Sequence, residues 1–111
     1  MNGQYIYGNF TSVITVTPGL PDPSNAAAYK YSSTQVKIIW NSVHGANGYE
    51  VWRSTSSTGT FTCQKTLSST SYINSGLAAG TKYYYKIRAY STVGGSKIYS
   101  AFSSLVSAIP S

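Results

Sequence analysis

The sequence predicts an all-β domain folded as a two-layered antiparallel sandwich, and three observations lead to this prediction. Apolar and polar residues alternate in several short segments, which is the pattern of half-buried strands. Clusters of glycine, proline, asparagine and serine separate these segments, as expected for tight turns. No stretch shows the helical repeat of apolar residues. The 111 residues are enough for one domain with a modest core.

Seven strands follow from the positions of the turns. The clearest turn signals between strands are His44 to Gly48, Ser57 to Gly59, Ala79-Gly80 and Gly94-Gly95. Seven short strands is the number found in the simplest immunoglobulin-like sandwiches. The predicted strands are, in order, 26–31, 35–41, 48–54, 60–67, 70–74, 81–91 and 101–109.

The alternation also predicts which side chains face the core. In the second predicted strand Trp40 is the largest residue of the inward face, in the third Tyr49 and Val51 share that face, and in the sixth Tyr83 and Ile87 do. A large aromatic side chain at the centre of a sandwich buries the most apolar area. We therefore expect these five residues to form the centre of the core.

Few ionisable side chains are present, too few for a catalytic site. Of the two acids, Asp22 lies in a proline-rich segment, where we expect a turn role, and Glu50 lies on an outward strand face. We expect Glu50 to form a surface ion pair with Lys86 or Arg88. His44 is the only histidine and falls in a loop. The sequence therefore predicts no catalytic residue, no metal site and no cofactor.

The charge balance is basic, but the basic residues are dispersed. Eight lysines and arginines against two acids give a net charge of +6, yet charged residues make up only 9% of the chain. No three basic residues are adjacent, whereas nucleic-acid binding favours a basic cluster, so we predict no nucleic-acid partner. No apolar run approaches the roughly 20 residues of a membrane span. Cys63 is the single cysteine and is expected to act as a small hydrophobic strand residue.

The two ends of the chain resemble each other at a constant offset of 92 residues (98 − 6 = 92). Five positions in 4–18 are identical to their counterparts in 96–110, for example Tyr7 with Tyr99 and Phe10 with Phe102. Such self-similarity indicates a tandem repeat. We interpret residues 1–18 as the last strand of a preceding repeat plus the start of a linker, and residues 19–111 as one complete domain.

Three segments of the complete copy resemble bacterial fibronectin type III domains. Ser33 to Trp40 is similar to the second strand of that family, whose Trp is a core residue. Gly45 to Ser54 is similar to the family's third strand, and Leu77 to Ala89 is similar to its Leu-x-Pro-Gly-Thr-x-Tyr segment and sixth strand. The resemblance covers roughly residues 21–109. One departure is Ala79, where the family usually has proline.

The resemblance implies a seven-stranded sandwich in which Leu77 also belongs to the core. It implies that Tyr83 is a tyrosine corner, whose hydroxyl binds the backbone near Leu77. It further implies an extracellular or cell-surface location, because such domains occur as modules of secreted and surface proteins of Gram-positive bacteria. A signal peptide is not seen at Met1-Asn2-Gly3-Gln4.

A candidate binding patch lies on the outward face of the third and sixth predicted strands. It consists of Trp52, Tyr84, Lys86 and Arg88. An aromatic ring flanked by tyrosine and arginine has the composition of an interaction surface. The alternative is that the Trp52 ring covers arginine or lysine stems or packs on the adjacent repeat.

Three functions remain open after these observations. The first is a non-catalytic spacer and interaction module whose partners are neighbouring repeats of the same chain. The second is an accessory domain that binds carbohydrate or cell-wall polymer through the aromatic patch. The third is a protein-binding domain of the adhesin type, although no Arg-Gly-Asp sequence occurs.

Overall fold

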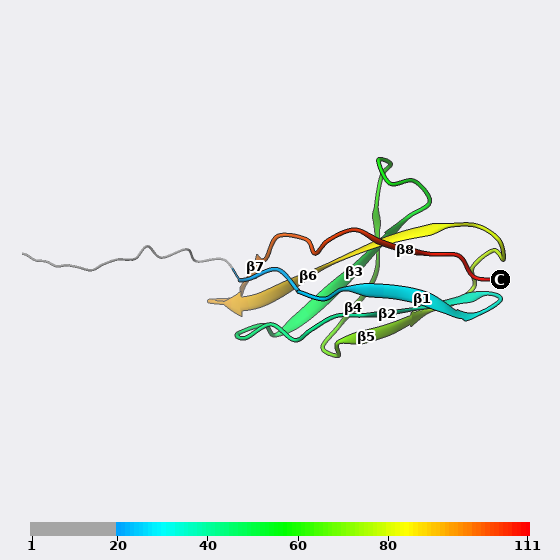
Figure 1. Ribbon diagram of the computed structural model, residues 1–111. Helices are drawn as coiled ribbons and strands as arrows, with labels where there is room; N and C mark the ends of the chain where they lie inside the picture. Colours follow the sequence, from blue (N-terminus) through cyan, green and yellow to red (C-terminus); the bar gives the residue numbers. More distant parts are fainter. Residues whose placement is uncertain (1–19) are drawn as a thin grey trace, which may run out of the picture.

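A computed structural model describes residues 20–111, and within them the chain forms two antiparallel sheets packed face to face (Figure 1). None of the described residues is helical, so nothing in this part of the chain could cross a membrane as a helix. The predicted last strand of a preceding repeat, 1–18, lies outside the described residues. The strands are β1 (Ala27–Ser32), β2 (Gln35–Ile39), β3 (Gly48–Ser54), β4 (Thr62–Leu67), β5 (Ser71–Asn74), β6 (Tyr83–Val93), β7 (Ser96–Tyr99) and β8 (Val106–Ala108).

The smaller sheet has the order β1-β2-β5, and the larger has β4-β3-β6-β7 with β8 also paired to β6. The central pair of the larger sheet, β3 and β6, is in register over seven residue pairs from Gly48↔Tyr90 to Ser54↔Tyr84. This register places alternate residues of both strands on the same face. One face is buried against the smaller sheet, and the other is the outer surface of the sandwich.

The core lies between the sheets and contains the residues assigned to it from the sequence. Each of the six, Leu77 included, is at most 7% exposed. Trp40 and Tyr49 meet edge to face with centroids 5.6 Å apart. The six residues are Trp40, Tyr49, Val51, Leu77, Tyr83 and Ile87.

Two tyrosine hydroxyls close loops onto the core. The Tyr83 hydroxyl accepts a hydrogen bond from the Ala78 amide at 2.9 Å, which is the arrangement expected of a tyrosine corner. The Tyr49 hydroxyl accepts one from the Val43 amide at 2.8 Å. Each bond satisfies a backbone donor that the loop would otherwise leave unpaired. The loops before β3 and before β6 are thereby fixed to their strands.

The prediction of one long final strand, 101–109, was wrong. The chain turns at Gly94-Gly95 as predicted, and both glycines have positive φ (59° and 84°), which suits a two-residue hairpin. It then forms β7 against the end of β6 and rejoins β6 only at β8. The described chain therefore has eight strands where seven were expected.

Two serines explain how the stretch between β7 and β8 stays attached to β6. The Ser100 hydroxyl accepts a hydrogen bond from the Ala89 amide at 2.8 Å, and the Ser103 hydroxyl accepts one from the Ile87 amide at 3.0 Å. Their own amides donate to the Ala89 and Ile87 carbonyls. Side-chain oxygens here replace backbone carbonyls of a regular ladder, and period-two patterning gives no sign of such a substitution.

Candidate functional site

The predicted binding residues all lie on the outer face of the larger sheet. In the register of β3 with β6, Trp52 lies opposite Lys86, and Glu50 lies opposite Arg88. Tyr84 lies at the end of the same row, opposite Ser54, and its ring is 5.4 Å from the Lys82 ammonium. The structure therefore gathers Trp52, Lys86 and Arg88 in one cluster and sets Tyr84 apart at its edge.

Glu50 is the charged centre of this outer face, and only 7% of it is exposed. Arg88 Nε lies 2.8 Å from Glu50 Oε1, so the ion pair expected from the sequence forms with Arg88. Trp52 Nε1 donates to the same oxygen at 3.0 Å. The pair was expected at the surface, but the side chain of Glu50 is covered by its neighbours. A buried carboxylate needs such partners, because its desolvation is costly without them.

Aromatic rings from distant segments cover the two cations. The Arg88 guanidinium lies 3.8 Å from the Tyr99 centroid, 5.1 Å from that of Phe102 and 5.3 Å from that of Trp52. The Lys86 ammonium lies 4.2 Å from the Phe102 centroid and 4.4 Å from that of Phe61. We call this surface the cation–aromatic face; it consists of Trp52, Phe61, Lys86, Arg88, Tyr99 and Phe102.

The sequence pattern did not identify Phe61, Tyr99 or Phe102 as members of this face. Phe61 precedes β4, and Phe102 belongs to the irregular stretch between β7 and β8, where strand periodicity does not apply. A signal was present, since Tyr99 and Phe102 are among the identities shared by the two ends of the chain. The Phe102 ring also meets the Trp52 ring edge to face, with centroids 5.9 Å apart.

The geometry limits what the cation–aromatic face can do. Each cation faces at least two rings, and each such contact contributes roughly 0.5–2 kcal/mol depending on desolvation. The rings of this face contact Lys86 and Arg88 of the same chain. The face therefore attaches the β7–β8 stretch to the sheet.

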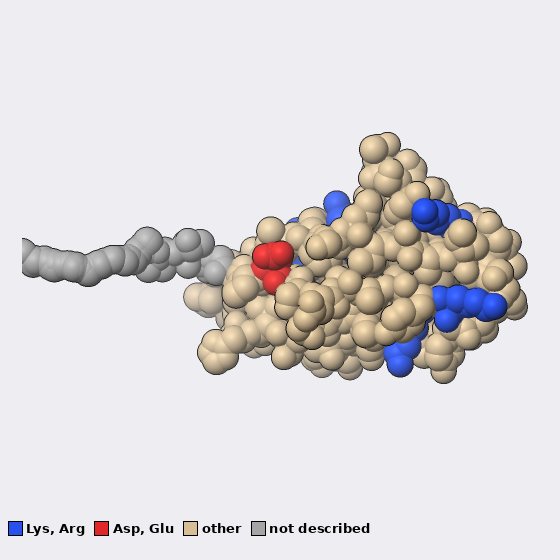
Figure 2. Space-filling model, in the orientation of Figure 1, with Lys and Arg blue, Asp and Glu red and all other residues tan. Residues whose placement is uncertain are grey.

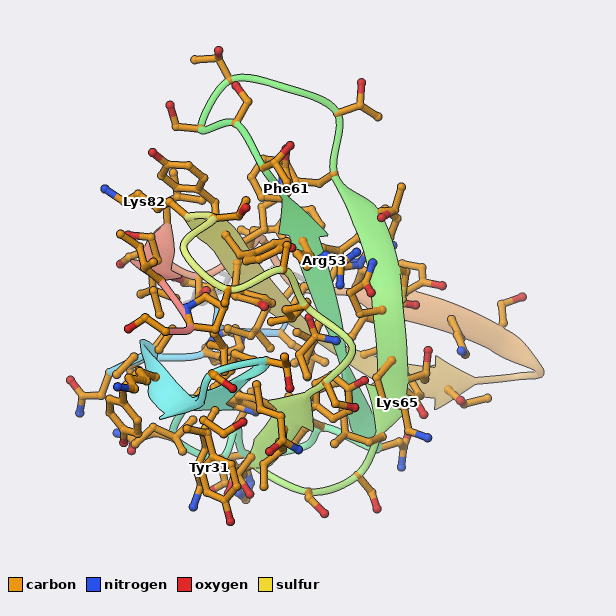
Figure 3. All side chains as sticks on the ribbon, turned by 90° about the vertical axis from the view of Figure 1, so that its right-hand side faces the viewer. Tyr31, Arg53, Phe61, Lys65 and Lys82 are labelled. Atoms are coloured by element: carbon orange, nitrogen blue, oxygen red, sulfur yellow. The ribbon has the colours of Figure 1, made fainter. Side chains whose placement is uncertain are left out.

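A second surface leaves aromatic side chains more open. On the outer face of the smaller sheet, Tyr29 is 45% exposed and Tyr31 is 55% exposed. Tyr29 lies opposite Lys37 of β2, which in turn lies opposite Ile73 of β5. Tyr31 stands on the other side of the sandwich from Phe61 (Figure 3). We call this surface, formed by Tyr29, Tyr31, Lys37 and Ile73, the tyrosine face.

The described residues offer no enclosed site for chemistry. They enclose no pocket, and they contain no group of three or more metal-binding side chains. In the view of Figure 2 the lysines and arginines stand apart as separate groups, and one acidic group lies near the start of the described chain. Cys63, expected as a small hydrophobic residue, lies in β4 as predicted but is exposed, because β4 is an edge strand of the larger sheet. Its expected role in packing was wrong.

Comparison with known proteins agrees with the two-sheet arrangement. Residues 21–105 match the family described as fibronectin type III domain. The chain belongs to the fibronectin type III family. A solved structure of an Fn3-like protein from Clostridium thermocellum has a TM-score of 0.68 and 34% identity to it, covering 82% of this chain and 91% of that one.

Parts of large bacterial enzymes are also similar to this fibronectin type III domain. An alpha-amylase of Niallia circulans is 34% identical over 97 residues, covering 79% of the chain but 7% of the amylase. Exoglucanase B of Cellulomonas fimi is 31% identical over 110 residues, covering 89% of the chain and 10% of that enzyme. The chain thus spans a small fraction of the length of these curated relatives.

Proposed function

We propose that the chain is a non-catalytic spacer and interaction module of a modular, extracellular bacterial protein that acts on a polymer. The observation that supports this most is the pattern of similarity to the enzymes. The matches cover 79% and 89% of the chain, yet they correspond to 7% of the amylase and 10% of the exoglucanase. A segment of that size is one domain beside a much larger remainder.

The shape and chemistry of the domain support the same function. The described chain starts at one end of the sandwich, next to the β6–β7 hairpin, and finishes at the other (Figure 1). A domain with its ends at opposite poles adds its full length to the separation of its neighbours. The one well-placed carboxylate, Glu50, is held by Arg88 and Trp52 and has no second carboxylate beside it.

A hydrolysis assay tests the non-catalytic part of this proposal. The full chain is incubated with starch and with cellulose, and released reducing sugar is measured against an α-amylase and a cellulase as positive controls. We expect no product above that of buffer. Product that disappears in the Glu50→Gln variant, while circular dichroism shows the variant folded, would overturn the proposal.

The tyrosine face favours a second candidate function, binding of a polysaccharide chain. Exposed tyrosines present an apolar ring together with a hydroxyl, which suits a ligand that has both apolar and hydrated surfaces. Tyr29 and Tyr31 are more exposed than Tyr99, at 38%, on the cation–aromatic face. The greater exposure of these two rings supports the tyrosine face as the binding surface.

Co-sedimentation with insoluble cellulose and with Gram-positive cell walls tests this second candidate. We expect the double variant Tyr29→Ala/Tyr31→Ala to lose binding, whereas Tyr84→Ala, which removes a tyrosine from the other sheet, keeps it. Loss in Tyr84→Ala alone would move the site to the predicted patch. Loss of binding in salt for every variant would reduce it to charge attraction, and no binding by the unaltered chain would contradict the candidate.

A further inference from the structure

The structure gives chemical meaning to the similarity between the two ends of the chain. Tyr99 and Phe102 cover Arg88, and the Ser103 hydroxyl accepts a hydrogen bond from the Ile87 amide. The counterparts of Tyr99, Phe102 and Ser103 at the offset of 92 residues are Tyr7, Phe10 and Thr11, which keep both rings and the hydroxyl. The counterpart of Ser100 is Gly8, which lacks a hydroxyl, so the similarity keeps most but not all of the residue types that attach the β7–β8 stretch to its sheet.

The C-terminal end of the domain is anchored up to Pro110. This proline is buried, and its carbonyl accepts a hydrogen bond from the Gly80 amide at 2.6 Å, in the turn before β6. Its counterpart is Pro18, one of the identities between the two ends. We therefore take Pro18 to correspond to the last anchored position of a preceding copy.

The N-terminal end of the described domain is anchored from Leu20 onward. Leu20 packs against the core, and its side chain lies beside Gly45 in the turn before β3. Pro23 is fully buried, and the Ser24 carbonyl accepts a hydrogen bond from the Asn41 amide at 3.0 Å. The chain is thus held by this domain from position 20.

Between the two anchored positions only Gly19 remains. Consecutive Cα atoms are 3.8 Å apart, so Pro18 and Leu20 are separated by at most about 7.6 Å. Two domains joined at this distance have their facing ends next to each other. We propose that the N-terminal end of this domain is a docking surface for the C-terminal end of the preceding repeat of the same chain.

The surface that this partner would cover surrounds the entry of the chain. It comprises the turn from His44 to Asn47 and the tip of the β6–β7 hairpin, which lie with Leu20 at one end of the sandwich (Figure 1). Val93, next to the hairpin turn, is 58% exposed, the most exposed of the large hydrophobic residues described. An apolar side chain at this place is explained if a neighbour covers it.

The complementary surface is seen at the other end of the domain. It contains the turn from Ala78 to Gly80, to which Pro110 is bonded, and Ile109, which is 46% exposed. In the preceding copy the residue that matches Ile109 is Thr17, which is smaller and more polar. The inference rests on the proposed spacer function, and it makes the spacer a stiff rod rather than a flexible string.

A two-repeat protein tests the docking surface. Residues 1–110 are joined directly to a second copy of 19–111, and a control carries a ten-residue Gly-Ser insertion at the junction. NMR relaxation of the second copy gives its rotational correlation time. We expect one long correlation time, shared by both copies, in the directly joined protein, and a fall towards the value of the single chain in the control. Equal values in the two proteins would overturn the inference.

A surface variant assigns the effect to the docking surface itself. Val93→Ser in the second copy is expected to shorten the correlation time of the directly joined protein, whereas Leu105→Ser, which alters a residue 45% exposed between β7 and β8, should leave it unchanged. Unchanged unfolding midpoints of the single-chain variants show that both fold. Equal effects of the two variants would contradict the assignment. The hydrolysis assay is independent, so failure of the docking surface and failure of the non-catalytic function are distinguishable.

Discussion

The two faces of β6 are built from alternate residues of one strand, yet they exclude water in different ways. On the inner face Tyr85 and Ile87 are fully buried in the core, where the Tyr85 hydroxyl is bonded to Asn74. On the outer face Lys86 and Arg88 are covered by rings, and Arg88 is paired with Glu50. The difference shows that an outward strand face is an open surface only where no other segment crosses it.

The largest expected effect contrasts the two tryptophans of the molecule. Trp40→Ala removes a core side chain that is 4% exposed, and should lower the free energy of unfolding by about 3–5 kcal/mol. Trp40 Nε1 is buried without a hydrogen-bond partner among the described residues, so apolar contact accounts for its contribution. Urea unfolding monitored by circular dichroism gives the free energy of unfolding of Trp40→Ala and of Trp52→Ala, and we expect the smaller loss for Trp52→Ala. A larger loss for Trp52→Ala would reverse the ranking of the two faces.

The next effect concerns the charge centre of the outer face. Arg88→Ala leaves Glu50 buried with Trp52 as its remaining partner, and should cost about 2–3 kcal/mol of stability. Arg88→Lys keeps the charge but loses the planar stack over Tyr99, so it should recover part of this loss. Thermal unfolding of the three proteins provides the comparison. A melting temperature unaffected by Arg88→Ala would mean that the outer face contributes no stability.

A smaller effect isolates the attachment of the final stretch to β6. Ser103→Ala leaves the buried Ile87 amide without its acceptor and should cost about 1–2 kcal/mol. Ser103→Thr retains the hydroxyl, as Thr11 does at the matching position, and is the control. Hydrogen exchange at the Ile87 amide should quicken in the alanine variant and stay slow in the threonine variant. Slow exchange in both would show that the hydroxyl is dispensable.

The smallest effect is a pH dependence from the inner face. Burial raises the pKa of Tyr85, whose hydroxyl donates to Asn74 Oδ1 at 2.8 Å. The unfolded chain loses this proton near pH 10 while the folded chain retains it, so the stabilisation is present below pH 10 and declines above it, by about 1 kcal/mol at pH 11. Tyr85→Phe should be less stable at pH 7 and show a shallower decline above pH 10. Parallel curves for the two proteins would exclude this contribution.

Strand periodicity was sufficient to predict the sandwich and the inner face of β6. Residues such as Trp40 and Ile87 are buried because side chains alternate about a strand, a rule that requires no knowledge of other segments. The tyrosine corner at Tyr83 was anticipated through family resemblance rather than periodicity. Its bond to the Ala78 amide lies at the expected place.

The outer face could not be predicted in the same way. Whether Trp52 is open to solvent depends on Phe102, a residue fifty positions later in a stretch without strand pairing. The path of that stretch follows from the Ser100 and Ser103 hydroxyls, and serine is common enough in this chain to give no local signal. For the same reason, β7 was not predicted, and the expected final strand, 101–109, is a strand only over β8.

The placement of the two ends at opposite poles also determines how the domain bears mechanical tension. A pull on the chain from both sides acts along β1, at the entry, and along β8, at the exit (Figure 1). The hydrogen bonds that hold these strands to β2 and β6 run across the strand direction. Such a pull strains the bonds of each strand together in shear instead of opening them one after another, so the fold resists extension between whatever it connects.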